Sequence, residues 1–496
     1  MDFSWLEFYG PRYGPEWGSG GIFGLRYHRG LLYYTVAFEA KANFINIREG
    51  YVRRYNFELV GPLPTSGGDT YNAVEAVDDF LYFGGWVHAP AVYRGRESGS
   101  LATISFVNKF SHVHVYDIRE DSVKLLWKES LHHETDWVGE VSEIIYDEIS
   151  DRLLLARGDG MINLGVYQID RKGGSYRQLS SRPAQKGSIL YDHACFDILE
   201  NWVQGVSGIQ CIDLVENKLK TLYFGDIAQR SVDGDSVESP LTGVAASAYG
   251  RLFLFVRGGV FVGNPIDESI ESVKFVRMFD FVKSGYNARR TMAKPIGGGI
   301  LVAFNAFTEN VVKPTNDFEK MMFLATNTIA APSLLVYITP PTARIVGAFG
   351  ARITGIEIIG DEILLAYNTM ANSSRYDAQP IDGGYRGIFS IPTSILNSPP
   401  PPIRIKILGT QVDNKTFGGI PLAGYREAKM VIRTSKPNKI KIFEYDIGLP
   451  SQQAFEDQHS LNNGKNIIDL HSYGNSIVSF KLVEPDPKAV IQIDLM

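Results

Sequence analysis

Residues 143–160, EIIYDEISDRLLLARGDG, contain the pattern that decides the fold. A short apolar segment leads into a polar turn, and a second, more continuously apolar segment leads out of it. Short apolar segments that are separated by turn residues are typical of paired antiparallel strands. The stretch therefore predicts a β-hairpin.

The same pattern recurs along the chain at intervals of roughly 50 to 65 residues, which is typical of β-propeller blades. Clear copies are Ala73–Gly85, Gly243–Gly259, Pro295–Phe307, Gly355–Met370 and Leu470–Phe480, and looser copies are Gly24–Val36, the region around His193–Val203, and Gly424–Thr434. A second strand pair, such as His112–Trp127, completes four antiparallel strands per blade. We predict an all-β protein: a β-propeller with seven or eight four-stranded antiparallel blades.

One domain is predicted over residues 1–496, because the composition shows no break and a propeller ring closes only when all its blades are present. Insertions are predicted near residues 305–332 and 371–387. The first insertion contains the best short helix candidate, Asn316–Asn327. Ser398–Pro402 (SPPPP) predicts a stiff polyproline connector.

Composition narrows the class of protein. The chain has 44% hydrophobic residues and a formal net charge of −6 without a basic stripe, so we expect a globular protein that does not bind nucleic acid. There is no apolar run of about 18 residues to span a membrane, and the N-terminal residues lack the pattern of a secretory signal. Cys195 and Cys211 are too few for a disulfide scaffold, and Cys195 is predicted to be a small buried residue. A reducing, cytoplasmic location is expected.

Polar residues gather at one predicted face of the propeller. Antiparallel strands alternate in direction, so the first and third strands of a blade start on the face where the second and fourth strands end. The polar residues at such positions are Asn72, His88, His112, His132, His133, Glu134, Asp136, Glu140, Arg157, Asp159, Asp192, His193, Asn287, Arg289, Arg290 and Asn305. We expect them to share one rim at the mouth of the channel.

The histidines on this rim suggest a metal site. Neutral imidazole is the commonest side-chain metal ligand, and carboxylates beside it favour iron, manganese or zinc. The sequence predicts one divalent metal (Fe, Zn or Mn), or else no cofactor. The candidate ligands are His88, His112 or His114, His133 and His193, with Asp136 or Glu140 as a further ligand or a hydrogen-bond partner of one. In the alternative interpretation the histidines belong to structural networks, with His112 and His114 on one face of a partly exposed strand.

A second group of rim residues needs no metal. Arginine and asparagine side chains there offer donors for a carboxylate or phosphate, and Asp136 or Glu140 is the candidate catalytic base. The candidate ligand-binding residues are Asn72, Arg157, Asp159, Asn287 and Arg290, together with Arg289. The alternative is that the arginines pair only with carboxylates of the rim.

Between Thr70 and Asp197 the chain contains the motifs FGGWVHAP, NKFSHVHVYD, KESLHHETDWVGEVSEIIYD, DRLLLARGDGMINLGVY and YDHACFD. Through them it resembles an uncharacterised archaeal family, a domain of unknown function. The resemblance implies an archaeal source and a cytoplasmic setting, and it supplies no activity.

Two weaker resemblances concern the fold alone. Carotenoid-cleaving oxygenases are similar in placing four histidines around an iron, although the histidines here are concentrated in blades two to four. Lactonase-like propellers are similar in the residue types Asn72, Glu75, Asp136, Glu140 and Asn287, which would hold calcium near the channel.

Two functional classes remain open. In the first, the rim binds a small ligand and acts as a metal-dependent hydrolase or oxygenase. In the second, the same rim, with Trp86 and Trp137, is a non-enzymatic scaffold that docks a protein partner. The oligomeric state is not predicted by either class.

Overall fold

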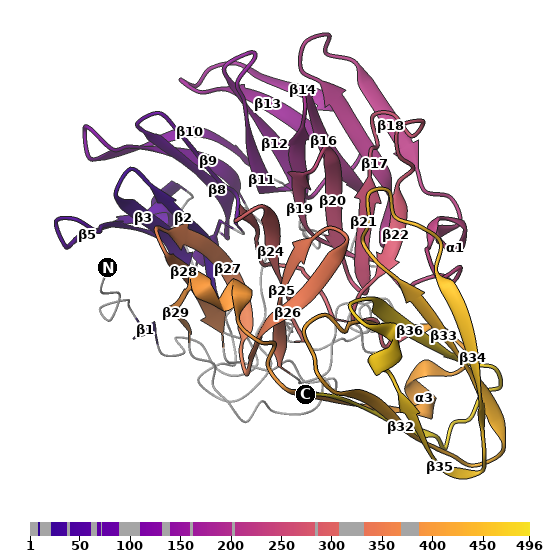
Figure 1. Ribbon diagram of the computed structural model, residues 1–496. Helices are drawn as coiled ribbons and strands as arrows, with labels where there is room; N and C mark the ends of the chain where they lie inside the picture. The colour runs from indigo at the N-terminus through magenta and orange to yellow at the C-terminus, as the bar shows by residue number, and fades with distance from the viewer. Residues whose placement is uncertain are drawn as a thin grey trace, which may run out of the picture.

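Antiparallel sheets make up nearly all of the structure, which is a computed structural model (Figure 1). It describes residues 8–9, 21–36, 40–60, 67–70, 72–88, 110–130, 139–158, 162–200, 204–282, 286–306, 332–368 and 386–496. Within these ranges the two α-helices, α1 (Ile227–Arg230) and α3 (Gly409–Val412), have four residues each. No helix in the described ranges is long and apolar enough to cross a membrane. The prediction of an all-β protein is confirmed.

Seven sheets follow one another along the chain and form the blades of a β-propeller. Blades one and two consist of β2 (Ile22–His28), β3 (Leu31–Val36), β4 (Lys41–Asn46) and β5 (Tyr51–Asn56), and of β6 (Gly67–Asp69) with β7 (Val74–Val77), β8 (Phe80–His88), β9 (Phe110–Asp117) and β10 (Ser122–Ser130). Blades three and four consist of β11 (Glu140–Asp147), β12 (Arg152–Gly158), β13 (Val166–Asp170) and β14 (Tyr176–Ser180), and of β15 (Gly187–Leu190), β16 (His193–Leu199), β17 (Val206–Asp213) and β18 (Leu219–Tyr223).

The remaining three blades close the ring. Blades five and six consist of β19 (Thr242–Ala248), β20 (Arg251–Val256), β21 (Gly259–Gly263) and β22 (Lys274–Arg277), and of β23 (Ala293–Ile296), β24 (Gly299–Phe304), β25 (Ser333–Thr339) and β26 (Thr342–Phe349). Blade seven consists of β27 (Arg352–Ile359), β28 (Glu362–Asn368) and β29 (Arg386–Pro392), and its fourth strand is β1 (Phe8–Tyr9) from the other end of the chain. The first strands of the blades contact one another in order, from β2 to β27 and back to β2. The predicted blade number of seven or eight is therefore met with seven.

The second strands of blades one, five and six are largely apolar because they are covered on both faces. Every residue of β3, β20 and β24 is buried. A strand packed between two neighbouring blades cannot alternate between a wet and a dry face, so its sequence loses the period of two. This explains the asymmetry of the repeated hairpin, in which the second segment is the more apolar.

Two further sheets at the C-terminal end are not blades. One contains β30 (Ile403–Leu408), β37 (Val490–Leu495), β32 (Ala428–Thr434) and β35 (Gly464–Asp469), and the other contains β31 (Phe417–Pro421), β36 (Ile477–Leu482), β33 (Asn438–Tyr445) and β34 (Phe455–Leu461). Their buried side chains, among them Met430, Ile442, Phe480 and Ile491, belong to one core that continues into blades five and six. The sheets lie beside those blades, in orange and yellow in Figure 1.

Two hairpins predicted in the C-terminal region are wrong. Within Gly424–Thr434 only β32 forms, and its partners are β35 and β37. Within Leu470–Phe480 the 3-10 helix η5 (His471–Tyr473) precedes β36, whose partners are β31 and β33. A strand pattern shows that a segment is extended, but it does not show which distant strand pairs with it. The single domain over residues 1–496 stays a prediction.

The chain enters these sheets through the predicted polyproline segment. Blade seven ends in the 3-10 helix η4 (Thr393–Asn397), and Ser398, with φ −75° and ψ 156°, begins the Ser398–Pro402 connector in front of β30. The predicted helix Asn316–Asn327 and nearly all of both predicted insertions lie outside the described residues.

A fully buried arginine joins blade five to the C-terminal sheets. Arg277, at the end of β22, donates from Nε to Asp233 Oδ2 at 2.7 Å and also pairs with Asp280. Its carbonyl oxygen accepts a hydrogen bond of 3.0 Å from the Tyr445 hydroxyl of β33. The backbone of Asp280 exchanges two hydrogen bonds with Gly418 of β31. This buried cluster therefore fixes one edge of the propeller against the last two sheets.

The two cysteines form a disulfide, which differs from the expectation that Cys195 is only a small buried residue. Cys195 on β16 and Cys211 on β17 are directly paired in the sheet, with a Cα–Cα distance of 4.0 Å. Both are buried in the core of blade four. Cys195 is buried in a strand as predicted, but the disulfide was missed, because spacing along the chain does not show that two residues are cross-strand neighbours.

Candidate functional site

A pocket of about 340 Å³ lies in the channel at the centre of the ring. Its walls are the first strands of blades one to six and the residues next to them, from β2 to β23. Ligand pockets in proteins typically begin at about 300 Å³. The channel thus contains a cavity large enough for a small molecule.

Charged side chains project into this channel from a repeated strand position. Arg26, Glu75, Lys294 and Glu357 each stand two residues before the last residue of their strand, in β2, β7, β23 and β27. Side chains of a strand point alternately to opposite faces, so equivalent positions of successive blades face the same side of the ring. Glu143 enters from β11, and Lys186 precedes β15.

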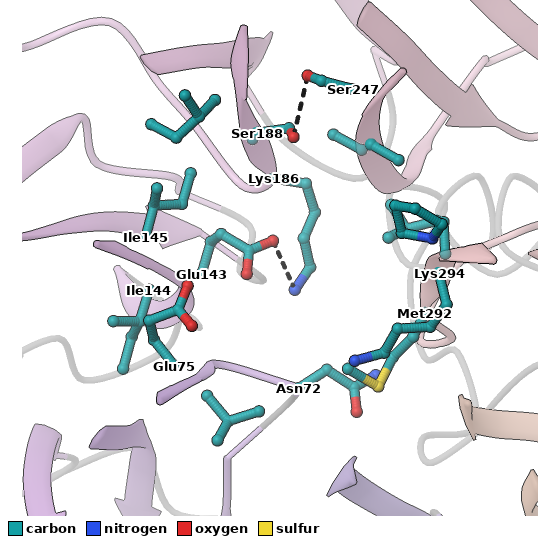
Figure 2. Close-up of a pocket in the computed structure, with 18 of the residues that line it drawn as sticks. Asn72, Glu75, Glu143, Ile144, Ile145, Lys186, Ser188, Ser247, Met292 and Lys294 are labelled. Atoms are coloured by element: carbon teal, nitrogen blue, oxygen red, sulfur yellow. Dashed lines mark hydrogen bonds and ion pairs between the residues drawn. The ribbon is translucent and has the colours of Figure 1, made fainter. Parts of the chain in front are cut away.

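Three ion pairs connect these six side chains. Arg26 Nη2 lies 3.0 Å from Glu75 Oε1, and Lys294 Nζ lies 3.0 Å from Glu357 Oε2. Lys186 Nζ lies 3.5 Å from Glu143 Oε2, as the dashed line in Figure 2 shows, and it also donates to the Ser142 carbonyl. We call the six residues the channel charge cluster. It contains equal numbers of acidic and basic groups.

Burial shifts the pKa of two members of the cluster. It raises the pKa of Glu143 from 4.5 to about 7, although Lys186 opposes the shift, and Glu75 raises this pKa further. Burial lowers the pKa of Lys294, and Glu357 partly offsets that effect. The Glu143 carboxyl is therefore able to exchange a proton near neutral pH.

Four members of the channel charge cluster are grouped by sign around the pocket, whereas Arg26 and Glu357 lie beside partners of the opposite sign. Glu75 and Glu143 come from blades two and three, whereas Lys186 and Lys294 come from blades four and six. Figure 2 shows the two glutamates on one side, Lys294 on the other, and Lys186 between them. Between the lysines, blade five contributes only Val244–Ser247. Small and aliphatic side chains thus lie between the two ammonium groups.

Asn72 lies at the end of the pocket where the first strands begin. Its Oδ1 accepts a 2.6 Å hydrogen bond from the Gly24 backbone N–H, and its Nδ2 donates to the carbonyl oxygens of Thr291 and Thr354 at 3.1 Å each. The side chain thus joins blade two to blades one and seven and to the segment that precedes blade six. Asn72 was predicted as a ligand-binding residue, and it does line the pocket.

The other predicted ligand-binding and catalytic residues that the structure describes do not line this pocket. Glu140 begins β11 and is fully buried, and Asn287 and Arg290 are buried in the segment before β23. Arg157, near the end of β12, donates from Nε to the Gly139 carbonyl at 3.0 Å and from Nη1 to the Tyr176 hydroxyl at 2.8 Å. It also lies over the Trp127 ring and pairs with Glu129, so its guanidinium serves contacts between blades two and three.

The predicted metal ligands are only partly described. Asp136, Asp159, His133 and the side chain of His88 lie outside the described residues. No group of three or more His, Cys, Asp or Glu side chains suited to a metal ion occurs in the part of the chain that the structure describes. The metal site, and with it the choice of Fe, Zn or Mn, stays a prediction.

Of the three described candidates among the histidines, His112 and His114 lie together, with 3.1 Å between their Nδ1 atoms, and His193 lies apart from them. His112 is fully buried in blade two against Phe57 and His114, so the strand that carries both is not partly exposed as expected. Burial lowers the pKa of His112 to about 3, which keeps its imidazole neutral. His193 opens β16, the second strand of blade four, and pairs with Asp192 at 2.6 Å. It therefore lies on the opposite face of the propeller from the predicted rim.

The misplacement of His193 has a local cause. The first strand of blade four, β15, has only four residues, GSIL, and the Tyr191–Asp192 turn follows it. So short a strand gives little pattern in the sequence, and the start of the blade was predicted at Asp192 and His193 instead. The error moved both residues by one strand and so to the other face.

Sequence reasoning missed five members of the channel charge cluster as site residues and weighed Glu75 only by analogy. A signal was available, because VEAV, SEII and IEII each place a glutamate inside an otherwise apolar first strand. A charge in the most enclosed strand of a blade requires partners, and only the centre of the ring supplies them. The predicted site residues lie at the strand ends instead.

The raised pKa of Glu143 predicts that stability falls as pH rises from about 4.5 to 7. In this range the folded protein keeps a proton on Glu143 that the unfolded chain has lost, so raising the pH favours unfolding. The decrease is at most about 3 kcal/mol. Urea unfolding of wild type and Glu143→Gln at pH 5 and pH 7 measures it, and the variant is expected to lose this part of the pH dependence.

The comparison with the variant is needed because burial also raises the pKa of Asp197 to about 6, which acts in the same direction. Glu268→Gln, at an ion pair with Arg230 outside the channel, is the matched control and should keep the wild-type pH dependence. An unchanged pH dependence in Glu143→Gln would contradict the prediction.

Comparisons with known proteins agree with the resemblance seen in the sequence. Residues 32–376 match the model of a family described as "Uncharacterized protein conserved in archaea (DUF2139)". A search of curated proteins found no match. The matched residues include every member of the channel charge cluster except Arg26.

Solved structures with similar folds have low sequence identity. The β-propeller domain of the Trilobed protease from Pyrococcus furiosus is 11% identical, with 75% of this chain and 94% of that chain covered and a TM-score of 0.39. Saccharomyces cerevisiae Sqt1 is 8% identical, with 73% and 81% covered and a TM-score of 0.38. A chain of a nidogen/laminin complex is 9% identical, with 49% and 73% covered and a TM-score of 0.29. The fold assignment rests on the sheets themselves.

Proposed function

The chain belongs to the family of uncharacterized proteins conserved in archaea, and we propose that its function is to bind a small polar molecule in the pocket at the centre of its propeller. The channel charge cluster carries this proposal. Six ionisable side chains surround or border a cavity of about 340 Å³. The sequence predicted a small-ligand site at the rim. We propose a site that needs no metal and that lies inside the channel.

The reason is the free energy that such a cluster costs. Taking charged groups out of water is unfavourable, and apolar residues of similar size often replace a buried ion pair without loss of stability. Apolar packing could therefore give the folded protein about as much stability as these three ion pairs do. Buried ionisable groups with shifted pKa values in a concave site are typical of functional sites.

The two more specific predictions remain proposals. Metal-dependent hydrolysis or oxidation depends on His88 and His133, whose side chains lie outside the described residues. A protein-interaction scaffold depends on the rim around Trp86 and Trp137, of which Trp86 is buried in blade two and Trp137 lies outside the described residues. Neither proposal has the support that the channel gives to small-molecule binding.

A thermal-shift screen tests the proposed function. The library should contain carboxylates, phosphates, amines, zwitterions, sugars and nucleotides, and each hit is confirmed by isothermal titration calorimetry. We expect at least one compound to raise the melting temperature, because a ligand at 100 times its Kd stabilises the folded protein by about 2.7 kcal/mol. Its affinity should fall at least tenfold in Lys294→Met, which removes a charge from the pocket wall.

Two further variants make the test specific. Lys218→Met removes an equally charged side chain that is 77% exposed and lies away from the channel, and it should bind like wild type. Ser247→Leu fills part of the pocket and should also weaken binding if Lys294→Met proves unstable. Absence of any hit, or hits that bind Lys294→Met and Ser247→Leu as tightly as wild type, would refute the proposed function.

A further inference from the structure

The pocket's charge pattern specifies a class of ligand, and this inference rests on the proposed function. We infer that the ligand is a zwitterion of the α-amino-acid class with an aliphatic side chain. Its ammonium group would face the acidic wall formed by Glu75 and Glu143, and its carboxylate would face Lys186 and Lys294. Three features of the pocket support this assignment.

The first feature is the balance of charge. The channel charge cluster has three carboxylates and three cations, all joined in pairs. A ligand with a net charge would leave that charge uncompensated in a poorly solvated cavity, which is unfavourable. A zwitterion carries no net charge and can still exchange the existing ion pairs for pairs with its own two groups.

The second feature is the separation of the walls. Glu75 and Glu143 belong to blades two and three, with Arg26 beside Glu75. The two lysines belong to blades four and six, on either side of blade five, with Glu357 beside Lys294. A molecule that carries two opposite charges on neighbouring atoms has one favourable orientation in such a field. The hydroxyls of Ser188 and Ser247, 3.0 Å apart in the wall between blades four and five, add further polar groups to the pocket (Figure 2).

The third feature is the chemistry of the uncharged wall. Its residues are aliphatic or small, including Val74, Ile144, Ile145, Val244 and Met292. No aromatic ring is among the residues that line this pocket in the described part of the chain. This wall therefore supplies no ring on which a sugar, a nucleobase or a quaternary ammonium group would stack. It does supply apolar contacts for an aliphatic side chain.

Calorimetry with a leucine series tests the inference on the full chain at pH 8. The ligands are L-leucine, L-valine and L-alanine, together with 3-methylbutylamine and 4-methylpentanoate, which keep the leucine side chain but lack the carboxylate or the amine. At least one of the amino acids is expected to bind. Each leucine analogue with a single charge should bind at least tenfold more weakly than L-leucine.

Variants assign the two charged groups of the ligand to the two walls. Lys294→Met should weaken L-leucine binding at least tenfold but leave 3-methylbutylamine unchanged, because that amine has no carboxylate to lose a partner. Glu143→Gln should weaken L-leucine binding and leave 4-methylpentanoate unchanged. Lys218→Met is the control and should not alter any of these affinities.

The outcomes separate this inference from the proposed function. If the amino acids do not bind while a sugar, a phosphate or a singly charged compound binds in a manner that depends on Lys294, the ligand class is wrong and the binding function stands. The same conclusion follows if the single-charge analogues bind as tightly as L-leucine. If no compound of any class binds, both proposals are refuted.

Discussion

Replacing Arg277 by Met is expected to lower the free energy of unfolding by about 3–5 kcal/mol, because it leaves the buried carboxylates of Asp233 and Asp280 without their shared cation. The methionine side chain fills much of the same space, so the loss of charge compensation dominates. Burial already raises the pKa of Asp280 against the opposing effect of Arg277. Urea unfolding, followed by circular dichroism and by tryptophan fluorescence, measures the change.

The matched control is Arg404→Met. Arg404 pairs with Asp494 in the C-terminal sheets, but its side chain is 69% exposed, so its loss should cost less than about 1 kcal/mol. Equal effects of the two substitutions would contradict the prediction. Because Arg277 is next to β31, its loss should also expose the contact between blade five and the C-terminal sheets, which limited proteolysis would detect.

Asn72→Ala is expected to destabilise the protein by about 4 kcal/mol. The substitution removes the partner of the Gly24 N–H and of the Thr291 and Thr354 carbonyl oxygens, and each buried polar group left unpaired costs about 1–3 kcal/mol. Asn72 also has a φ of 59°, a left-handed conformation that asparagine tolerates better than alanine. Thermal and urea unfolding measure the total.

Asn72→Gly separates the two causes. Glycine adopts the positive φ without strain, so this variant should lose the hydrogen bonds but not the backbone preference, and should be about 1 kcal/mol more stable than Asn72→Ala. If both variants unfold like wild type, the hydrogen bonds between the blades do not hold the ring together.

Much of the propeller could be predicted from local patterns. The hairpins at Ala73–Gly85, Gly243–Gly259 and Gly355–Met370 correspond to β7 with β8, β19 with β20, and β27 with β28. In each case a short turn connects two strands that pair with each other, so the fold is encoded within a few residues. Glu140 and Arg157 were likewise placed correctly at the start of β11 and the end of β12.

The rest depends on contacts between distant segments. β30 pairs with β37, with Ile403 opposite Leu495, and no local pattern indicates that partner. The channel charge cluster is distant in the same way, since Lys294 finds Glu357 in the next blade and Arg26 finds Glu75. The candidate site was therefore placed at the strand ends, where polar residues are obvious, and only Asn72 was identified in common with the pocket.

Strand β1 has a consequence for how the protein is made. Phe8 pairs with Gly387, so the ring closes between a strand near one end of the chain and the last blade. During translation β1 leaves the ribosome on the order of 20 s or more before β29, at the roughly 5–20 residues per second of protein synthesis. Blade seven therefore cannot be completed during that time, and β1 stays on the nascent chain without its partner strand, open to wrong pairing.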